Sequence, residues 1–351
     1  MKTILVTGGL GFIGSHTCVT LLERGYKVLI LDSLINSSIK VIERIKQIIL
    51  VTKYNPNEQL QFYECDLRDE LKLEKIFKNN TSESKKIDAV IHFAGFKSVS
   101  ESINNPLRYF DFNVLSTINL LKIMEKFNCK KIVFSSSATI YGNNCKDYNI
   151  KEDAFINPSN PYGETKVIIE KILQNLSLSS NSWSISILRY FNPIGAHPSG
   201  LIGENPLGMP NNIFPIINEV ASRERKNLNI FGNDWETFDG TGVRDYIHVM
   251  DLADGHVLAL EYLFKNVGEI IKLNLGTGKG TSVLELISVF KSVNKIEIPY
   301  LFSQRRKGDV ARSVADITLA KEKLNWSPIR DLKTMCTDGW KWKKQNINGY
   351  K

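Results

Sequence analysis

The first 190 residues alternate short apolar runs with longer segments of helical periodicity, and this alternation constrains the fold more than any other feature. The apolar runs are nearly continuous, as expected for strands buried on both faces. Strands joined by helical crossovers form a parallel sheet covered by helices. The sequence therefore predicts an α/β fold with a doubly wound parallel sheet. The predicted strands are 3–6, 28–32, 60–66, 88–95, 131–134 and 183–190, and the predicted helices are 14–24, 38–50, 68–78, 106–127 and 162–176.

Beyond residue 190 the regular alternation weakens, and glycine, proline and asparagine become frequent. We place a boundary there, between a first domain at 1–190 and a smaller mixed α/β lobe at 191–351. In the second lobe, elements are predicted at 215–225, 228–231, 270–275, 282–293 and 332–343. A segment at 240–264, with a helix at 251–264, is expected to pack back on the first domain.

A glycine-rich turn joins the first predicted strand to the first helix. Gly8, Gly11 and Gly14 fit the pattern Gly-x-x-Gly-x-x-Gly, which lets the backbone approach a pyrophosphate at a helix N-terminus. The turn predicts a Rossmann-type dinucleotide site. Asp32 ends the second strand, where a carboxylate bonds ribose hydroxyls and repels a 2′-phosphate, so we expect NAD rather than NADP. Ends of later strands would contact adenine and line the dinucleotide: Asp66, Phe93, Ala94 and Gly95.

Tyr162 and Lys166 lie four residues apart where a helix is predicted to begin, so both project from one face. An ammonium near a phenol is expected to lower the phenol pKa, which would make Tyr162 a general base. Ser137 follows the fifth strand and can supply a hydroxyl to the same site. A Tyr-x-x-x-Lys pair alone is common on helices and a serine run alone is usually a turn. The order of the three motifs predicts redox chemistry on an alcohol carbon with a nicotinamide cofactor.

Composition argues against several other classes of protein. The formal net charge is +8, but the lysines are scattered along the chain rather than clustered with aromatic residues, so no nucleic-acid partner is expected. No apolar run reaches the roughly 18 residues of a membrane helix, and the N-terminus runs straight into a strand. The cysteines are odd in number and unpatterned, which predicts reduced thiols in the cytoplasm and no metal site. They are Cys18, Cys65, Cys129, Cys145 and Cys336.

With these motifs in place, the chain resembles the extended short-chain dehydrogenase/reductases, and within them the UDP-glucose 4-epimerase family, over nearly its whole length. The stretches that carry the resemblance are 91–95, 189–193, 195–200 and 240–248. The resemblance implies an NAD-dependent isomerase of galactose metabolism that interconverts UDP-galactose and UDP-glucose. C4 would be oxidised to a ketone, the sugar would rotate, and C4 would be reduced again. By analogy, helices 106–127 and 162–176 would form a homodimer interface.

The resemblance also assigns roles to residues. Tyr162 would act as acid and base on the sugar 4-hydroxyl, Lys166 would bond the nicotinamide ribose, and Ser137 would bond the 4-oxygen. Further cofactor contacts would come from Phe12, Ile13, Ser33, Leu67, Lys97, Asn113 and Tyr190. UDP-hexose contacts would come from Asn192, Asn212, Phe231, Arg244, Tyr246, Arg306, Asp309 and Ser313. Ser33 and Phe112 stand where members of the family often carry asparagine.

Two other functions share the fold. A sugar-nucleotide 4,6-dehydratase or decarboxylase is the nearer one, but dehydratases usually carry an Asp-Glu pair after the catalytic hydroxyl residue, and residues 138–140 are Ala-Thr-Ile. A non-catalytic NAD-sensing protein is the other, and such proteins commonly lose the tyrosine or the lysine. Within the epimerase family, a small residue at Ser313 would leave room for a sugar 2-acetamido group. UDP-N-acetylglucosamine and UDP-N-acetylgalactosamine are therefore expected as additional substrates.

Overall fold

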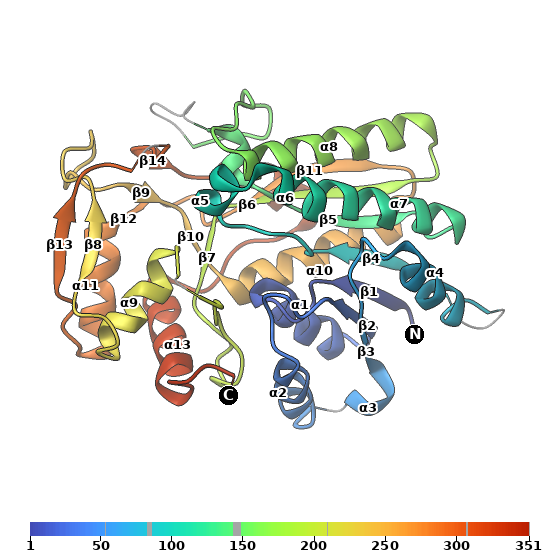
Figure 1. Ribbon diagram of the computed structural model, residues 1–351, viewed down its shortest axis with the longest axis horizontal. Helices are drawn as coiled ribbons and strands as arrows, with labels where there is room; N and C mark the ends of the chain where they lie inside the picture. Colours follow the sequence, from blue (N-terminus) through green and yellow to red (C-terminus); the bar gives the residue numbers. More distant parts are fainter. Residues whose placement is uncertain (53, 83–85, 143–148, 209, 307, 351) are drawn as a thin grey trace.

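A computed structural model of the chain describes residues 1–52, 54–82, 86–142, 149–208, 210–306 and 308–350. Its centre is a seven-stranded sheet in the order β11-β6-β5-β4-β1-β2-β3 (Figure 1). Every neighbouring pair in it is parallel, which confirms the predicted Rossmann-type sheet. The strands are β1 (Thr3–Thr7), β2 (Lys27–Asp32), β3 (Leu60–Glu64), β4 (Ala89–His92), β5 (Lys131–Ser137), β6 (Ser184–Tyr190) and β11 (Ile270–Leu275).

Helices cover both faces of this sheet, because the strands are apolar on both sides. Ile4 and Val6 of β1 belong to one buried cluster and Leu5, between them, belongs to another. The first cluster is completed by α1 (Phe12–Glu23), α2 (Lys40–Ile49) and α10 (Val249–Lys265). The second is completed by α4 (Glu70–Asn79), α7 (Ser116–Lys126) and α8 (Pro161–Ser179). Shorter elements connect these layers: α3 (Pro56–Gln59), α5 (Val99–Asn104), α6 (Pro106–Tyr109), and η2 (Ala138–Tyr141).

The single helix predicted at 106–127 is interrupted. A π-helical turn, η1 (Phe110–Leu115), separates α6 from α7. Hydroxyl groups at the junction bond backbone carbonyls one turn earlier, with Ser116 Oγ 2.6 Å from the Phe112 carbonyl and Thr117 Oγ1 2.6 Å from the Asn113 carbonyl. Such side chains offer helical carbonyls a partner other than the backbone N–H, which favours a wider turn.

The strand at 270–275 lies in the central sheet, not among the elements of the second lobe where the sequence placed it. As β11 it pairs in parallel with β6, so that Leu273 lies beside Leu188, and both side chains are fully buried. The chain returns to this edge through α10, which packs against α1. Arg24, the C-cap residue that follows α1, forms ion pairs of 3.1 Å with Asp254 and Glu261 of α10. The division of the chain at residue 190 remains a prediction.

Most of the remaining elements form a smaller lobe with its own apolar core, at the left of Figure 1. Phe214, Leu286, Phe290 and Met335 are among its buried side chains. Three small sheets join β10 to β7, β12 to β9 to β14, and β13 to β8. The strands are β7 (Asn192–Ile194), β8 (Leu228–Phe231), β9 (Val243–Arg244), β10 (Tyr246–His248), β12 (Thr281–Ser282), β13 (Tyr300–Ser303) and β14 (Arg312–Ser313). The helices are α9 (Ile213–Ala221), α11 (Val283–Asn294) and α13 (Leu332–Gln345). Helix α12 (Thr318–Leu324) instead packs against α10 and β11, with Ala320 and Leu324 in the first buried cluster of the central sheet.

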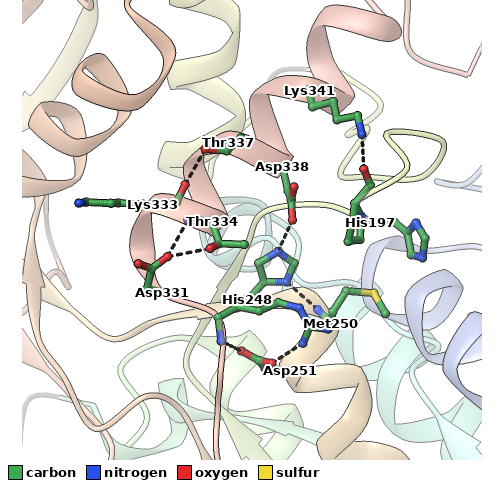
Figure 2. Close-up of polar contacts among 12 residues, drawn as sticks. His197, His248, Met250, Asp251, Asp331, Lys333, Thr334, Thr337, Asp338 and Lys341 are labelled. Carbon is green, nitrogen blue, oxygen red and sulfur yellow. Dashed lines mark hydrogen bonds and ion pairs between the residues drawn. The ribbon is translucent and has the colours of Figure 1, made fainter.

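Figure 2 shows the contacts that attach α13 to the start of α10. His248 caps α10, since its Nδ1 accepts from the Met250 amide at 3.0 Å, and its Nε2 lies 3.2 Å from Asp338 Oδ2 on α13. Asp251 accepts from the Arg330 amide at 2.9 Å and pairs with the Arg330 guanidinium. Because α10 packs on the central sheet, these bonds fix the second lobe to the first.

The helices and cysteines can be compared with what the composition predicted. Within the described residues, every helix is too short or too polar to cross a lipid bilayer. Four cysteines are buried, unpaired thiols: Cys18, Cys65, Cys129 and Cys336. Cys145 lies outside the described residues.

Candidate active site

A cleft of about 1210 Å³ runs along the carboxyl ends of the sheet strands, between the sheet and the second lobe. A typical site for one small ligand occupies roughly 300–1,000 Å³, so this cleft has room for more than one. The glycine turn and Asp32 line one end, Arg244 and Arg306 line the other, and Tyr162 lies among the lining residues. Among the predicted site residues, Asn113 and Tyr246 do not line the cleft and all others do.

The glycine turn brings the backbone very close to the end of β4. Gly8 has φ +66°, and a Cβ there would meet the Ala94 nitrogen at 2.7 Å. A Cβ on Gly14 would lie 2.3 Å from the Gly8 carbonyl oxygen. Helix α1 then begins at Phe12 with no side-chain cap on its N-terminus. The amide groups of that turn are therefore available to an anion, and the residues fit the pyrophosphate of a dinucleotide.

Asp32 is held at the end of β2 by three hydrogen bonds. Its Oδ2 accepts from the Leu10 amide at 3.0 Å, and its Oδ1 accepts from the Leu34 amide at 3.0 Å and the Ser37 hydroxyl at 2.7 Å. These bonds fix a carboxylate at the rim of the glycine turn, beside Ser33. A fixed negative charge at this position suits ribose hydroxyls and disfavours a 2′-phosphate.

Asp66 lines the same end of the cleft, but its carboxylate is paired. Arg68 Nη2 lies 2.8 Å from Asp66 Oδ2, and Arg68 Nη1 lies 2.5 Å from Asp111 Oδ2. The hydrogen bonds from Arg68 lower the pKa of Asp66. Arg68 was not singled out from the sequence, although its spacing of two from Asp66 permits this contact.

Asn113 lies behind the cleft, in the π turn. Its Oδ1 accepts from the Phe96 amide at 2.8 Å, and its Nδ2 donates to the Phe96 carbonyl and the Thr165 hydroxyl, each at 3.1 Å. A Cβ on Gly95 would meet this amide oxygen at 2.9 Å. Asn113 therefore joins the loop after β4 to α8 and shapes the wall that Gly95 presents to the cleft.

The predicted catalytic residues come together at the ends of β5 and α8. Asn160 caps α8 by accepting from the Gly163 amide at 2.9 Å, which places Tyr162 in the first turn. Lys166, one turn later, donates from Nζ to the Ser135 carbonyl at 2.8 Å. The Ser137 hydroxyl accepts from the Thr139 hydroxyl at 2.9 Å and lines the cleft with Tyr162.

The electrostatics of this pair differ from the expectation. Burial raises the pKa of Tyr162 to about 12, and the Ser137 hydroxyl offsets part of that increase. Burial lowers the pKa of Lys166 to about 8, against an opposing effect of Glu170. The Lys166 ammonium is 5.7 Å from the Tyr162 ring centroid and donates to a carbonyl instead. The predicted lowering of the tyrosine pKa by Lys166 is therefore wrong for this structure, because burial is the dominant effect on the phenol and Lys166 donates to a carbonyl rather than to Tyr162.

The other end of the cleft is built by the second lobe. Arg306 Nε lies 3.1 Å from Asp309 Oδ2, and its guanidinium lies 4.5 Å from the centre of the Phe231 ring. Burial lowers the pKa of Arg244. Ser313 of β14 pairs in register with Arg244 of β9. Two guanidinium groups and an aromatic ring thus face the cleft, a combination suited to a diphosphate attached to a flat base.

The rest of the predicted substrate residues divide into two groups. Asn192 at the start of β7 and Asn212 before α9 are exposed in the cleft. Tyr246 is 3% exposed and packs in the apolar core of the second lobe. Arg244 lies in β9 and Tyr246 in β10, which belong to different small sheets, so the two side chains do not share one face.

Glu204 was not predicted from the sequence, and no local pattern marks it. Its Oε1 accepts from Lys97 Nζ at 2.8 Å and from Asn212 Nδ2 at 3.1 Å. A second bond crosses the cleft nearby, from Asn211 Nδ2 to Ser98 Oγ at 3.0 Å. These bonds join the loop after β4 to the second lobe across the cleft.

Comparisons with known proteins agree with this geometry. Residues 5–339 match the family model described as GDP-mannose 4,6 dehydratase, so the chain belongs to the family that this model defines, among the extended short-chain dehydrogenase/reductases. The UDP-glucose 4-epimerase of Bacillus subtilis (strain 168) is 50% identical over 348 residues, which cover 99% of this chain and 98% of the relative. More particularly, therefore, the chain belongs to the UDP-glucose 4-epimerase family.

Solved structures of that family share the fold closely. The epimerase of Stenotrophomonas maltophila, crystallised with NAD and formylated UDP-arabinopyranose, is 44% identical with a TM-score of 0.93, and 99% of each chain is covered. The epimerase of Bifidobacterium longum, in complex with NAD+ and UDP, is 44% identical with a TM-score of 0.92. The match covers 99% of this chain and 100% of that one.

Proposed function

We propose that this protein interconverts UDP-galactose and UDP-glucose by oxidising C4 of the hexose, turning the 4-keto sugar and reducing it again. One observation carries the proposal. The Ser137, Tyr162 and Lys166 side chains lie in a single cleft between a dinucleotide cradle and an end lined by arginines. Proton transfer from a sugar hydroxyl needs side chains such as Tyr162 and Ser137, and binding of a sugar nucleotide needs the arginines.

NAD is the cofactor that fits the glycine turn and Asp32 at one end of the cleft. The tight glycine turn accepts a pyrophosphate, and Asp32 disfavours a 2′-phosphate. When bound, NAD supplies the hydride acceptor, and the positive charge of its oxidised ring favours an ionised phenol nearby. Lys97 and Tyr190 line the same part of the cleft and would contact it, together with the remaining predicted cofactor residues except Asn113, which lies behind the cleft.

Tyr162 would take the proton from the sugar 4-hydroxyl and return one after the sugar has turned. Ser137 would hold the 4-oxygen between these steps, because its hydroxyl faces the cleft beside the phenol. Lys166 would bond the nicotinamide ribose and keep a positive charge beneath Tyr162. With its pKa lowered to about 8 by burial, Lys166 is still largely charged near neutral pH.

The UDP part would be held by the second lobe. Arg244 and Arg306 would bond the diphosphate and Asp309 the uridine ribose, with Phe231 against the nucleotide. Asn192 and Asn212 line the cleft and would supply neutral donors to the same ligand. A firm hold on UDP with few bonds to the hexose would let the sugar present either face of C4 to one hydride acceptor.

Dehydration is the less favoured chemistry for this cleft. Elimination of water from a 4-keto sugar requires a second acid and base beyond the tyrosine. The residues that follow Ser137 are Ala138, Thr139 and Ile140, which form the short helix η2 and carry no carboxyl group. The family model that matches the chain is described as a dehydratase. The missing carboxyl group after Ser137 is therefore the feature that separates this chain from a dehydratase.

We also propose that the N-acetylated substrates are accepted. Ser313 lines the cleft one strand away from Arg244, and a serine occupies far less volume than an aromatic ring at the same position. A 2-acetamido group would therefore meet no bulky side chain there.

A cytoplasmic homodimer is the assembly we propose. Apolar side chains on α5, α6 and η1 are exposed, with Ile103 at 56%, Leu107 at 81% and Leu115 at 44%. These elements pack against α7 or α8, and exposed apolar side chains there suit contact with a second copy of the chain. Light scattering on a size-exclusion column measures this directly, and a monomeric mass would overturn the dimer.

The function is tested by incubating the purified protein with UDP-galactose, without added cofactor, and measuring UDP-glucose. We expect conversion toward the equilibrium mixture and the release of NAD on denaturation. No product with NAD present would overturn the activity, and recovery of NADP would overturn the cofactor assignment. A 4-keto-6-deoxy product would indicate a dehydratase.

A further inference from the structure

A third ionisable residue follows the catalytic pair on the same face of α8. Tyr162, Lys166 and Glu170 are spaced by four, so one lies above the next along the helix. The first two line the cleft, whereas Glu170 does not. Its side chain is 2% exposed. A buried carboxylate beneath a catalytic lysine, without access to substrate, calls for a physical explanation.

Glu170 is held by a compact polar network. Its Oε1 accepts from Ser136 Oγ at 2.5 Å and from Arg189 Nε at 3.0 Å, and its Oε2 accepts from Arg189 Nη2 at 2.7 Å. This is a two-pronged arginine–carboxylate pair with both side chains almost fully buried. Arg189 Nη1 donates to the Tyr141 hydroxyl at 3.0 Å and to the Glu152 carbonyl at 2.7 Å. The carboxylate therefore has a fixed position and a fixed orientation.

The network reaches the catalytic groups through β5. Ser135, Ser136 and Ser137 are consecutive at the end of that strand, so their side chains alternate in direction. The Ser135 carbonyl accepts from Lys166, and Ser137 lines the cleft. Ser136 points away from the cleft and bonds Glu170. Glu170 therefore holds the end of β5 from the side away from the cleft, and this end of β5 orients Lys166 and Ser137.

Among four ionisable side chains near Lys166 (Glu170, Tyr162, Tyr190 and His92), Glu170 is the one that carries a negative charge. Glu170 raises the pKa of Lys166 against the larger effect of burial. Tyr162 and Tyr190 also face this site, and burial raises the pKa of both phenols, so neither supplies a negative charge in this structure at neutral pH. His92 of β4 faces it too, but burial lowers the pKa of His92 to about 3 and leaves the ring neutral.

We propose that Glu170 is a positioning residue for the reaction, which keeps the Lys166 ammonium charged and, through Ser136, holds the end of β5 in place. Arg189 holds the carboxylate for that purpose. The inference rests on the proposed epimerase activity, because that activity is how it is measured. Glu170 does not line the cleft, so its loss changes turnover only through Lys166 and the end of β5.

The test is the pH dependence of kcat for UDP-galactose in Glu170→Gln, which keeps the shape of the side chain and removes its charge. We expect the alkaline limb of the profile to move to lower pH by about one unit, since a lysine without its carboxylate loses its proton more readily. At a pH above the limb, kcat then falls about tenfold while KM changes by less than about twofold.

Asp251→Asn is the matched control. It breaks another ion pair with a buried carboxylate, between Asp251 and Arg330 where α10 begins. We expect a lower Tm and an unmoved alkaline limb in this variant. If both variants move the limb alike, general loosening explains the effect and the proposal is overturned.

Breaking a buried pair leaves an unpaired charge, so Glu170→Gln can be poorly folded. The double variant Glu170→Gln with Arg189→Gln removes both charges and is expected to show the same movement of the limb. An unmoved limb in whichever variant is folded, by circular dichroism, overturns the proposal. Wild-type protein that does not convert UDP-galactose would overturn the proposed function instead.

Discussion

The two ends of the cleft differ in how firmly their side chains are held. At the chemical end, Tyr162 and Lys166 are 7% and 5% exposed, and a buried ion pair lies beneath them. At the UDP end, the Arg306 side chain is 52% exposed and its partner Asp309 is 25% exposed. The first set is fixed by the fold, whereas the Arg306 guanidinium at the other end is open to water.

This difference matches what each end would do. Proton and hydride transfer require reacting atoms to lie within a few tenths of an ångström of the right place, which rewards preorganised groups. An exposed ion pair is worth about 0–1 kcal/mol, so Arg306 can leave Asp309 for a phosphate at little cost. A rigid chemical end and an adaptable UDP end allow the nucleotide to be held while the sugar turns.

The largest effect is expected at the rigid end. Tyr162→Phe should lower kcat by about 10²–10⁴-fold, because a positioned general acid and base is lost. The ring still fills its buried place, so Tm and the amount of bound NAD should be unchanged. Turnover of this variant near the wild-type rate would show that another group moves the proton.

Acid should disturb the cofactor end before the UDP end. His16, His92 and His256 are buried around the cofactor part of the cleft, and burial lowers the pKa of His16 and His92 to about 3 and of His256 to about 4. The unfolded chain, with histidine pKa values near ~6.5, binds more protons than the folded one below that pH. The free energy of unfolding therefore falls as pH drops below about 6.5 and continues to fall toward pH 3 to 4.

At about pH 5.5, linkage gives a loss on the order of 1 kcal/mol for each of these histidines, or about 3 to 4 kcal/mol in all. Urea unfolding at pH 7.5 and 5.5, with bound NAD measured in parallel, checks this. His256→Gln removes one of these titrations and should reduce the difference between the two conditions. Equal stability at both pH values would contradict the prediction.

A smaller effect is expected at the adaptable end. Arg306→Ala should raise KM for UDP-galactose by about 10–100-fold, since a charged hydrogen bond to phosphate contributes about 1.5–3 kcal/mol. Arg305 is the matched control, because it pairs with Asp234 at 2.8 Å and does not line the cleft. Arg305→Ala should leave KM within about twofold. Equal effects of the two variants would remove Arg306 from the UDP site.

The smallest and most selective effect concerns Ser313. Ser313→Tyr should lower kcat/KM for UDP-N-acetylgalactosamine by about tenfold or more, because the ring would occupy the space for the acetamido group, and should change UDP-galactose turnover by only about twofold. Parallel assays of both substrates check this. If wild-type protein converts UDP-galactose but not the acetylated sugar, the pocket at Ser313 does not set the substrate range.

The features that the sequence determined by itself are local ones. Continuous apolar strands, helical spacing and the glycine turn specify the doubly wound sheet, because each depends on residues only a few positions apart. Tyr162 and Lys166 are likewise one turn apart, so their shared face followed from spacing alone. Within such a sheet, residues at strand ends such as Asp32 and Ser137 meet at one edge.

Only the tertiary structure decided what depends on distant neighbours. It placed β11 in the central sheet and moved Asn113 and Tyr246 away from the cleft lining. It also reversed the expected pKa shift of Tyr162, because burial by several elements is the dominant effect on this phenol. The partners of Glu170 and Glu204 come from other strands and another lobe, and no periodicity in the sequence encodes which buried carboxylate meets which arginine or lysine.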